Sequence, residues 1–249
     1  MAGLLLAAGT CWAYPSLLGP TGGVNLPVAD TVGQGRVEIG MDLLSNSTTS
    51  DYYTSDVLAT RMLFGVSPNA EIGVSYHAQS ASDNFDNDYF NNDQSFWGVN
   101  AKYVWPQEGT GTSFAIGGVY QQYSEDDTAN VFQAYGVASQ VFSHTSPTAL
   151  GCRGSLGVNW STDSNGDSAV RPFAILDLGF HGGVHLSGEY QARNSTFGDD
   201  QPIASAIMRI PLNPMRTVVG DIGLTNAYQG VYGDNKQHVM IGACVKFGG

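Results

Sequence analysis

The sequence is poor in charged residues and contains no long hydrophobic run. Only 13% of its 249 residues are Asp, Glu, Lys or Arg, about half the share found in ordinary soluble domains. No stretch of about 20 apolar residues is present, which excludes a membrane-spanning helix. The mean hydropathy is nevertheless only −0.10. Low charge without a hydrophobic run is typical of the alternating strands of membrane barrels.

Positive charge and cysteine are also scarce. The formal net charge is −12, with 10 Lys and Arg against 22 Asp and Glu. No basic stripe is present that could bind the phosphate backbone of a nucleic acid. The three cysteines are Cys11, Cys152 and Cys244. By strand parity Cys152 and Cys244 point to opposite faces, so we predict no disulfide between them.

The N-terminus has the pattern of a secretory signal. "GLLLAAGTCWA" is a short apolar core followed by small residues, and cleavage after Ala13 fits this pattern. We therefore predict a signal peptide over residues 1–13, which places the mature chain beyond the cytoplasm.

Short alternating segments dominate the rest of the chain and recur at intervals of roughly 15 to 25 residues. The predicted strands are 35–44, 56–66, 71–80, 94–105, 112–123, 131–142, 152–161, 170–180, 184–192, 203–211, 216–225 and 237–247. Tight turns such as "SPNA" and "HGG" alternate with long polar loops such as "SASDNFDNDYFNND", in which acidic residues gather. The predicted fold is all-β: a single antiparallel transmembrane β-barrel of about 12 strands (10–14), over residues 35–249, with short periplasmic turns and long acidic outer loops.

The segment "VHLSGEYQ", residues 184–191, shows the two faces that this fold requires. Leu186 and Tyr190 share one face, while Ser187 and Glu189 share the other. The scarce basic residues also fall on polar strand faces, where a lipid-facing charge would cost about 2–4 kcal/mol at the membrane midplane. We therefore predict that these charged residues line the lumen: Arg61, Glu71, Lys102, Arg153, Arg171, Asp177, Glu189, Arg209, Asp221 and Lys246.

The luminal charges allow two interpretations. In the first, Arg–carboxylate pairs fill and close a narrow barrel. In the second, the charges form a selective pore. The predicted set holds six basic and four acidic residues, an excess that would suit an anionic oligosaccharide or polysaccharide.

Aromatic residues fall near the ends of the predicted strands, as in the two interfacial girdles of such barrels. The girdle predicted at the periplasmic rim comprises Phe64, Trp105, Phe114, Phe142, Phe180 and Phe247. The girdle predicted at the outer rim comprises Tyr76, Trp97, Tyr123, Tyr135, Trp160 and Tyr190. The faces of segments 112–123 and 131–142 stay unassigned.

Two clusters carry residue types that catalysis or metal binding would use. His185, Ser187 and Glu189 are alternate residues of one strand, about 6.5–7 Å apart, which is too far for direct nucleophile–base hydrogen bonds. The loop with Asp83, Asp86, Asp88 and Asp93 is a weak candidate for Ca²⁺, because it lacks the glycine and terminal glutamate of an EF-hand loop. We expect no enzyme activity and no cofactor.

The segment between the signal and the first strand, residues 14–34, is rich in glycine and proline and is predicted to be an irregular periplasmic lead-in. Its "GPTGGVNLPVA" resembles the opening of YjbH-like outer-membrane barrel proteins, through Gly19, Pro20, Thr21, Gly22, Asn25, Pro27 and Ala29, then Gly35 and Gly40. This resemblance implies an outer-membrane barrel linked to exopolysaccharide secretion.

The sequence therefore predicts a passive pore or scaffold in the outer membrane of a bacterial cell envelope. Two other function classes stay open. One is an outer-membrane barrel enzyme acting on lipids, and the other is a secreted soluble β-sandwich that binds carbohydrate.

Overall fold

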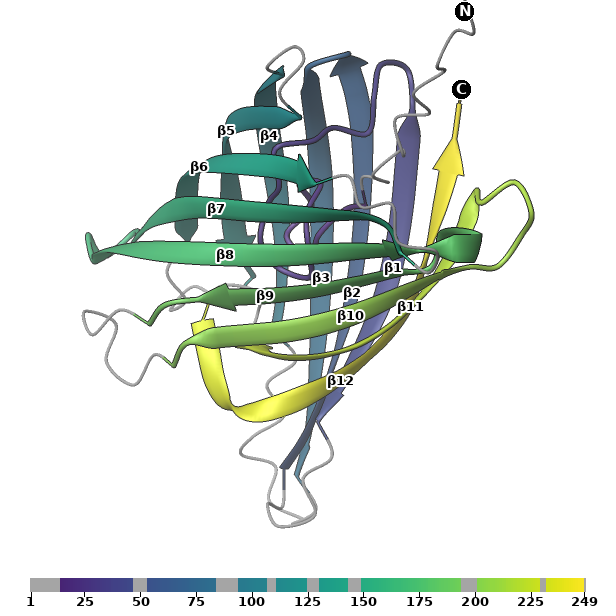
Figure 1. Ribbon diagram of the computed structural model, residues 1–249. Coiled ribbons are helices and arrows are strands. Elements are labelled where there is room, and N and C mark those ends of the chain that lie inside the picture. The colour runs from purple at the N-terminus through teal and green to yellow at the C-terminus, as the bar shows by residue number, and fades with distance from the viewer. Residues whose placement is uncertain are drawn as a thin grey trace, which may run out of the picture.

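The computed structural model describes residues 14–46, 53–83, 94–106, 111–124, 130–142, 149–193, 201–228 and 232–248. Within these ranges twelve antiparallel strands form one closed barrel, in which each strand pairs with the next and the last pairs with the first (Figure 1). One short 3₁₀ turn, η1 (His181–Gly183), interrupts the succession of strands. No helix in the described part of the chain is long and apolar enough to cross a membrane.

The strands are β1 (Val37–Asn46), β2 (Tyr53–Ser67), β3 (Ala70–Asp83), β4 (Gln94–Pro106), β5 (Thr112–Tyr123), β6 (Val131–Phe142), β7 (Ala149–Asp163), β8 (Ser168–Phe180), β9 (His185–Gln191), β10 (Ile203–Pro211), β11 (Val218–Tyr228) and β12 (Tyr232–Phe247). All twelve predicted strands are present. The barrel closes through β1 and β12, which pair from Val37 opposite Phe247 to Ser45 opposite Val239.

The observed strands differ from the predicted ones mainly at the outer rim. The predicted loop over 226–237 is largely strand, because β11 continues to Tyr228 and β12 begins at Tyr232. A register shift between Thr225 and Ala227 accommodates this extension. Hydropathy alternation is a signal only where one face is apolar, so it could not mark strand ends that are polar on both faces.

The wall of the barrel has two chemically different faces. On β1, Ile39, Met41 and Leu43 are 44–56% exposed on the outside, whereas Glu38 and Asp42 between them are at most 3% exposed on the inside. Alternation of this kind continues around the barrel because successive side chains of a strand point to opposite faces. The apolar outer wall suits contact with lipid, since an exposed apolar surface of this size is unfavourable in water.

Strands β5 and β6 are the two whose faces the sequence left unassigned. Phe114 and Ile116 of β5 point outward, while Ala115 and Val119 are buried inside the barrel. In β6 the inner face likewise carries Val137. These residues give part of each strand two apolar faces, because the inner residues pack against another apolar segment, which is described below. Gln121 and Gln133 lie on the same inner faces, nearer the outer ends of the strands.

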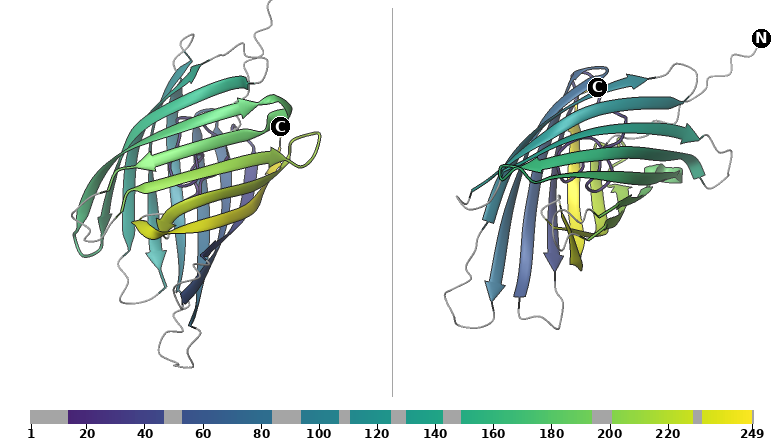
Figure 2. Two further views of the ribbon diagram at one scale, coloured as in Figure 1. Left: turned by 60° about the horizontal axis from the view of Figure 1, so that its bottom comes forward. Right: turned by 90° about the vertical axis from the view of Figure 1, so that its left-hand side faces the viewer.

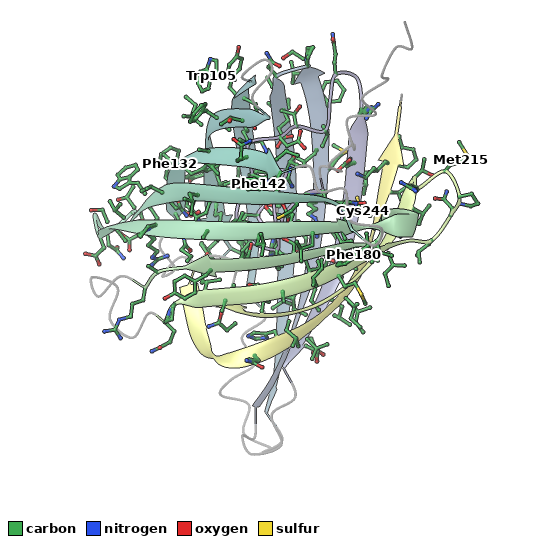
Figure 3. The ribbon with its side chains drawn as sticks, in the orientation of Figure 1. Trp105, Phe132, Phe142, Phe180, Met215 and Cys244 are labelled. Carbon is green, nitrogen blue, oxygen red and sulfur yellow. The ribbon has the colours of Figure 1, made fainter. Side chains whose placement is uncertain are left out.

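The aromatic girdles are present with two exceptions. Trp105 of β4 and Phe142 of β6 are exposed near the ends of their strands, as Figure 3 shows together with the exposed Met215 of the turn after β10. Trp160 and Tyr190 are exposed near the opposite rim. The prediction for Tyr123 and Tyr135 was wrong. Both side chains are buried inside the barrel, at 7% and 6% exposure, because odd-numbered residues of β5 and β6 face the lumen.

A charge placed on the outer wall tests the assignment of faces. Val99 lies near the middle of β4 and is 41% exposed on the outer wall. Val99→Arg should lower the free energy of unfolding in lipid vesicles by about 2–4 kcal/mol, because the guanidinium would enter the hydrocarbon layer. The measurement is a urea titration of the protein folded in vesicles. The control is Gln122→Arg near the outer end of β5, which should cost about 1 kcal/mol or less, and equal costs at both sites would contradict the assignment.

Candidate functional site

The inside of the barrel is occupied by residues 14–34, which we call the plug. Almost every residue from Tyr14 to Ala29 is buried, and Val28 and Thr21 are completely inaccessible. In Figure 1 strands β7–β10 cross the strands behind them at a steep angle, and the purple trace of the plug runs between these two walls. The two views in Figure 2 also show the purple trace of the plug inside the ring of strands.

Glu189 of β9 is the main anchor of the plug. Its carboxylate accepts hydrogen bonds from three consecutive main-chain N–H groups, those of Val24 (3.0 Å), Asn25 (2.8 Å) and Leu26 (3.1 Å). The Asn25 side chain adds a fourth bond through Nδ2 at 2.7 Å. Consecutive N–H groups form a concave anion site, so the turn of the plug is shaped to bind this carboxylate.

Two glycines make the turn possible. Gly22 pairs with Pro27 in an isolated bridge, and the Gly23 N–H donates to the Leu26 carbonyl at 2.8 Å. A Cβ on Gly22 would lie 2.0 Å from the Leu26 carbonyl oxygen, and a Cβ on Gly23 would lie 2.6 Å from Glu189 Oε2. Only glycine allows both approaches.

Glu71 and Lys102 form a second anchor on β3 and β4. Glu71 accepts hydrogen bonds from the Thr21 N–H (2.8 Å), the Thr21 hydroxyl (2.5 Å) and the Val32 N–H (3.1 Å). Lys102 lies 2.9 Å from Glu71 and donates to the carbonyls of Thr21 (2.9 Å) and Val28 (3.2 Å). This ion pair therefore binds N–H groups of the plug main chain through Glu71 and carbonyl groups through Lys102.

Arg209 and Lys246 make further contacts with the plug, at Gly23 and at its first residue, Tyr14. Arg209 donates to the Gly23 carbonyl at 2.6 Å, and its guanidinium lies 4.8 Å from the Tyr14 ring. Lys246 Nζ lies 3.9 Å from the centroid of the same ring, and cations close to an aromatic ring are favourable when desolvated. Burial raises the pKa of the Tyr14 hydroxyl well above its ordinary value, so the ring stays a neutral phenol.

Apolar packing completes the plug site. Leu26, Val28 and Ala29 belong to one buried cluster with wall residues of β4, β5, β6 and β8, including Val119 and Phe173. A second cluster joins Leu17 and Val24 of the plug to the inner face of β1, β2, β10 and β12. The wall and the plug therefore match in chemical character.

The structure places the predicted charged residues on the inner wall. Eight of the ten are at most 6% exposed, and Asp177 and Lys246 are somewhat more accessible. Four ion pairs join residues at directly facing positions of neighbouring strands: Glu71–Lys102, Arg153–Asp177, Arg209–Asp221 and Glu38–Lys246. Arg61 joins Asp42 of β1 to Asp221 of β11.

Three luminal acids were missed. Glu38 and Asp42 lie on the inner face of β1, and Asp30 of the plug pairs with Arg153 at 3.2 Å. The alternation in "VEIGMDLL" could have placed the first two, but burial of the plug has no local sequence signal. Among the described residues, seven acids and six bases therefore lie in the lumen. The basic excess inferred from the sequence was wrong, because it omitted these three acids.

Side-chain amides line the outer half of the lumen. Asn159 of β7 donates to Gln133 of β6 at 2.9 Å, and Gln133 donates to Gln121 of β5 at 3.3 Å. Gln121 Nε2 and Asn159 Oδ1, at the two ends of this row, have no hydrogen-bond partner among the described residues. Arg171 is buried at the position facing Asn159. Gln121 and Asn159 therefore offer a hydrogen-bond donor and an acceptor that no described residue of the wall uses.

The clusters considered for catalysis and metal binding have other surroundings. Ser187 and Glu189 are buried beside the plug, and the His185 ring lies edge-on to Tyr14, 5.9 Å away. Asp86, Asp88 and Asp93 lie outside the described residues, and Asp83 is the last residue of β3. No group of three His, Cys, Asp or Glu side chains within the described ranges could hold a metal ion. Cys152 and Cys244 are free.

Comparisons with known proteins agree on the fold. No protein-family model matches the chain, and no curated protein matches it in sequence. Among solved structures, the KdgM porin superposes with a TM-score of 0.55 at 11% identity, over 86% of this chain and 99% of the other. A KdgM porin in complex with disordered oligogalacturonate gives the same values. The Acinetobacter baumannii outer membrane protein Omp33 has a TM-score of 0.50 at 9% identity, over 86% and 98%. The chain thus has the barrel fold of these outer-membrane proteins.

Proposed function

We propose that this protein is a passive pore of the bacterial outer membrane whose lumen is closed at rest by the plug. The observation that carries the proposal is a closed barrel with an apolar outer wall and a charged, polar inner wall. An inner wall of this polarity is useful to a barrel that admits water and solutes. The similarity in fold to porins supports the same function.

Oligosaccharides are the solute class that the lumen suits best. Because the luminal charges nearly balance, net charge gives little selectivity. The amide row of Gln121, Gln133 and Asn159 instead provides hydrogen-bond donors and acceptors that match sugar hydroxyl groups. Buried Arg171 beside this row could pair with a carboxylate of an acidic sugar. The complex of KdgM with oligogalacturonate shows that a porin of similar fold binds an acidic oligosaccharide.

A link to exopolysaccharide secretion is the finer part of the proposal. It is supported by the resemblance of the plug sequence to the opening of YjbH-like barrel proteins. The residues that carry the resemblance are also those that build the plug site, since Thr21 binds Glu71 and Asn25 binds Glu189.

Removal of the plug tests the pore. A variant lacking residues 14–29 should conduct ions steadily in planar lipid bilayers, with a mean current at least about tenfold above that of the full chain, because the charge-assisted anchors that favour the closed state are gone. Oligogalacturonate added to the same bilayers should reduce the current, which tests the solute class.

Folding of the shortened chain must be shown independently, by a shift in gel migration on boiling. A folded variant that passes no current would contradict the pore and would favour a scaffold role for the barrel.

A further inference from the structure

Charged side chains of the wall bind the plug mainly at the main-chain groups of the plug. Glu71, Lys102, Glu189 and Arg209 each bind main-chain N–H or carbonyl groups of the plug, and the shortest of these bonds for each side chain is 2.6–2.9 Å long. Hydrogen bonds with one ionised partner are stronger than neutral ones. Four such side chains on four strands therefore form a binding site for an irregular peptide segment.

The ring of paired strands is complete without any contribution from the plug. Main-chain pairing is continuous around all twelve strands. The wall charges also have partners on the wall itself, as in the pairs Glu38–Lys246 and Arg153–Asp177. Loss of the plug would leave these pairs in place, and water would hydrate the groups that the plug had covered.

Glu189 is the wall charge that depends most on the plug. No Lys, Arg or His among the described residues forms an ion pair with it. Its contacts are the N–H groups of Val24, Asn25 and Leu26 and the Asn25 side chain, with the Ser205 hydroxyl as a further partner on the wall. The Asn25 side chain also reaches Ser205 (3.0 Å) and Thr225 (3.2 Å) on β10 and β11. Asn25 and Glu189 are thus the pair on which binding of the plug depends most.

The plug is joined to the wall covalently at one end, through the link that enters β1. Near this link, the Gly35 N–H donates to Gly65 of β2 at 2.8 Å and the Gly65 N–H donates to Arg36 at 3.0 Å. These bonds hold the residues that follow the plug against β2, and they do not involve the turn between Gly22 and Pro27. A segment tethered at its base and bound by polar contacts along its length is the geometry of an intramolecular ligand with a high effective concentration.

We propose that the plug is a detachable ligand: residues 14–29 leave and re-enter the lumen as one unit, and the pore conducts only while they are outside. This inference rests on the proposed pore function. The lumen is then a binding site for a peptide of the sequence around Thr21–Leu26, and the same peptide should close the pore when it is supplied as a separate molecule.

The experiment adds a synthetic peptide of residues 14–29 to planar bilayers that hold the variant lacking those residues. The peptide should block the current with increasing dose. A peptide with Asn25→Ala should need an about tenfold higher concentration, because it loses hydrogen bonds to a buried carboxylate. In a barrel that also carries Glu189→Gln, this difference between the two peptides should shrink to about twofold or less. A scrambled peptide of the same composition is the control.

The outcomes separate the two proposals. If the shortened barrel conducts but the peptide never blocks it, the detachable plug is wrong and the pore stands. If the shortened barrel is folded and silent, the pore itself is wrong. Where the shortened barrel does not fold, the full-length Glu189→Gln variant gives the answer. Its open probability should rise about tenfold over the parent protein, and an unchanged open probability would refute release of the plug.

Discussion

Replacing Arg61 with Met should cost the barrel about 3–5 kcal/mol of its free energy of unfolding, the loss typical of breaking a buried ion pair from one side. Arg61 is 4% exposed and lies between the carboxylates of Asp42 and Asp221, which are 0% and 4% exposed. The variant leaves two buried carboxylates with Arg209 as the remaining neighbouring cation. The measurement is denaturant unfolding of the refolded protein in detergent or vesicles.

Two variants sharpen this prediction. Arg61→Met combined with Asp42→Leu removes both partners of the pair, so most of the stability should return. Thr60→Met places the same side chain on the neighbouring position of β2, whose side chain points away from the lumen, and should change stability by about 0.5 kcal/mol or less. If Arg61→Met costs no more than Thr60→Met, the buried network does not stabilise the barrel.

Replacing Gly22 with Val should drive the plug out of the full-length barrel. The new Cβ would meet the Leu26 carbonyl oxygen at 2.0 Å, so the turn between Gly22 and Pro27 could not form as observed. The N–H groups of Val24, Asn25 and Leu26 would then lose their common alignment on Glu189. We expect the ratio of open to closed pores to rise about 100-fold, which corresponds to about 2.8 kcal/mol.

The readout is the mean current through planar bilayers, compared with the variant that lacks residues 14–29. Gly136→Ala is a matched control, because a Cβ there meets no atom within 4 Å. An open Gly136→Ala channel, or a closed Gly22→Val channel, would show that the turn does not hold the plug in place.

The strand plan could be predicted from the sequence because it depends on local alternation. Lys102, for example, lies between the outward-facing Ala101 and Tyr103, so parity alone places it inside the barrel. The scarcity of charge made each one informative, since a Lys or Arg facing lipid would be unfavourable.

The contents of the lumen could not be predicted in the same way. The plug has no period, and its partners Glu71 and Glu189 lie 50 and about 165 residues away along the chain. The two-sided apolar character of β5 and β6 was the available clue. Their inner residues Val119 and Val137 pack on the plug, so the ambiguity of the pattern was itself a sign of an occupied lumen.

The seam between β1 and β12 has a consequence for how the molecule is assembled. The plug precedes β1 directly, while its anchors on β9 and β10 belong to the last third of the chain. The contacts of the plug with Glu189 and Arg209 therefore cannot form until most of the wall has been synthesised. Once β1 and β12 have paired, the turn of the plug can enter the lumen only through one of the two open ends of the barrel. If β1 pairs with β12 before the plug binds, the newly made pore is first open; if the plug binds before this pairing, the pore is closed from the start. Contacts between residues so distant in sequence form slowly.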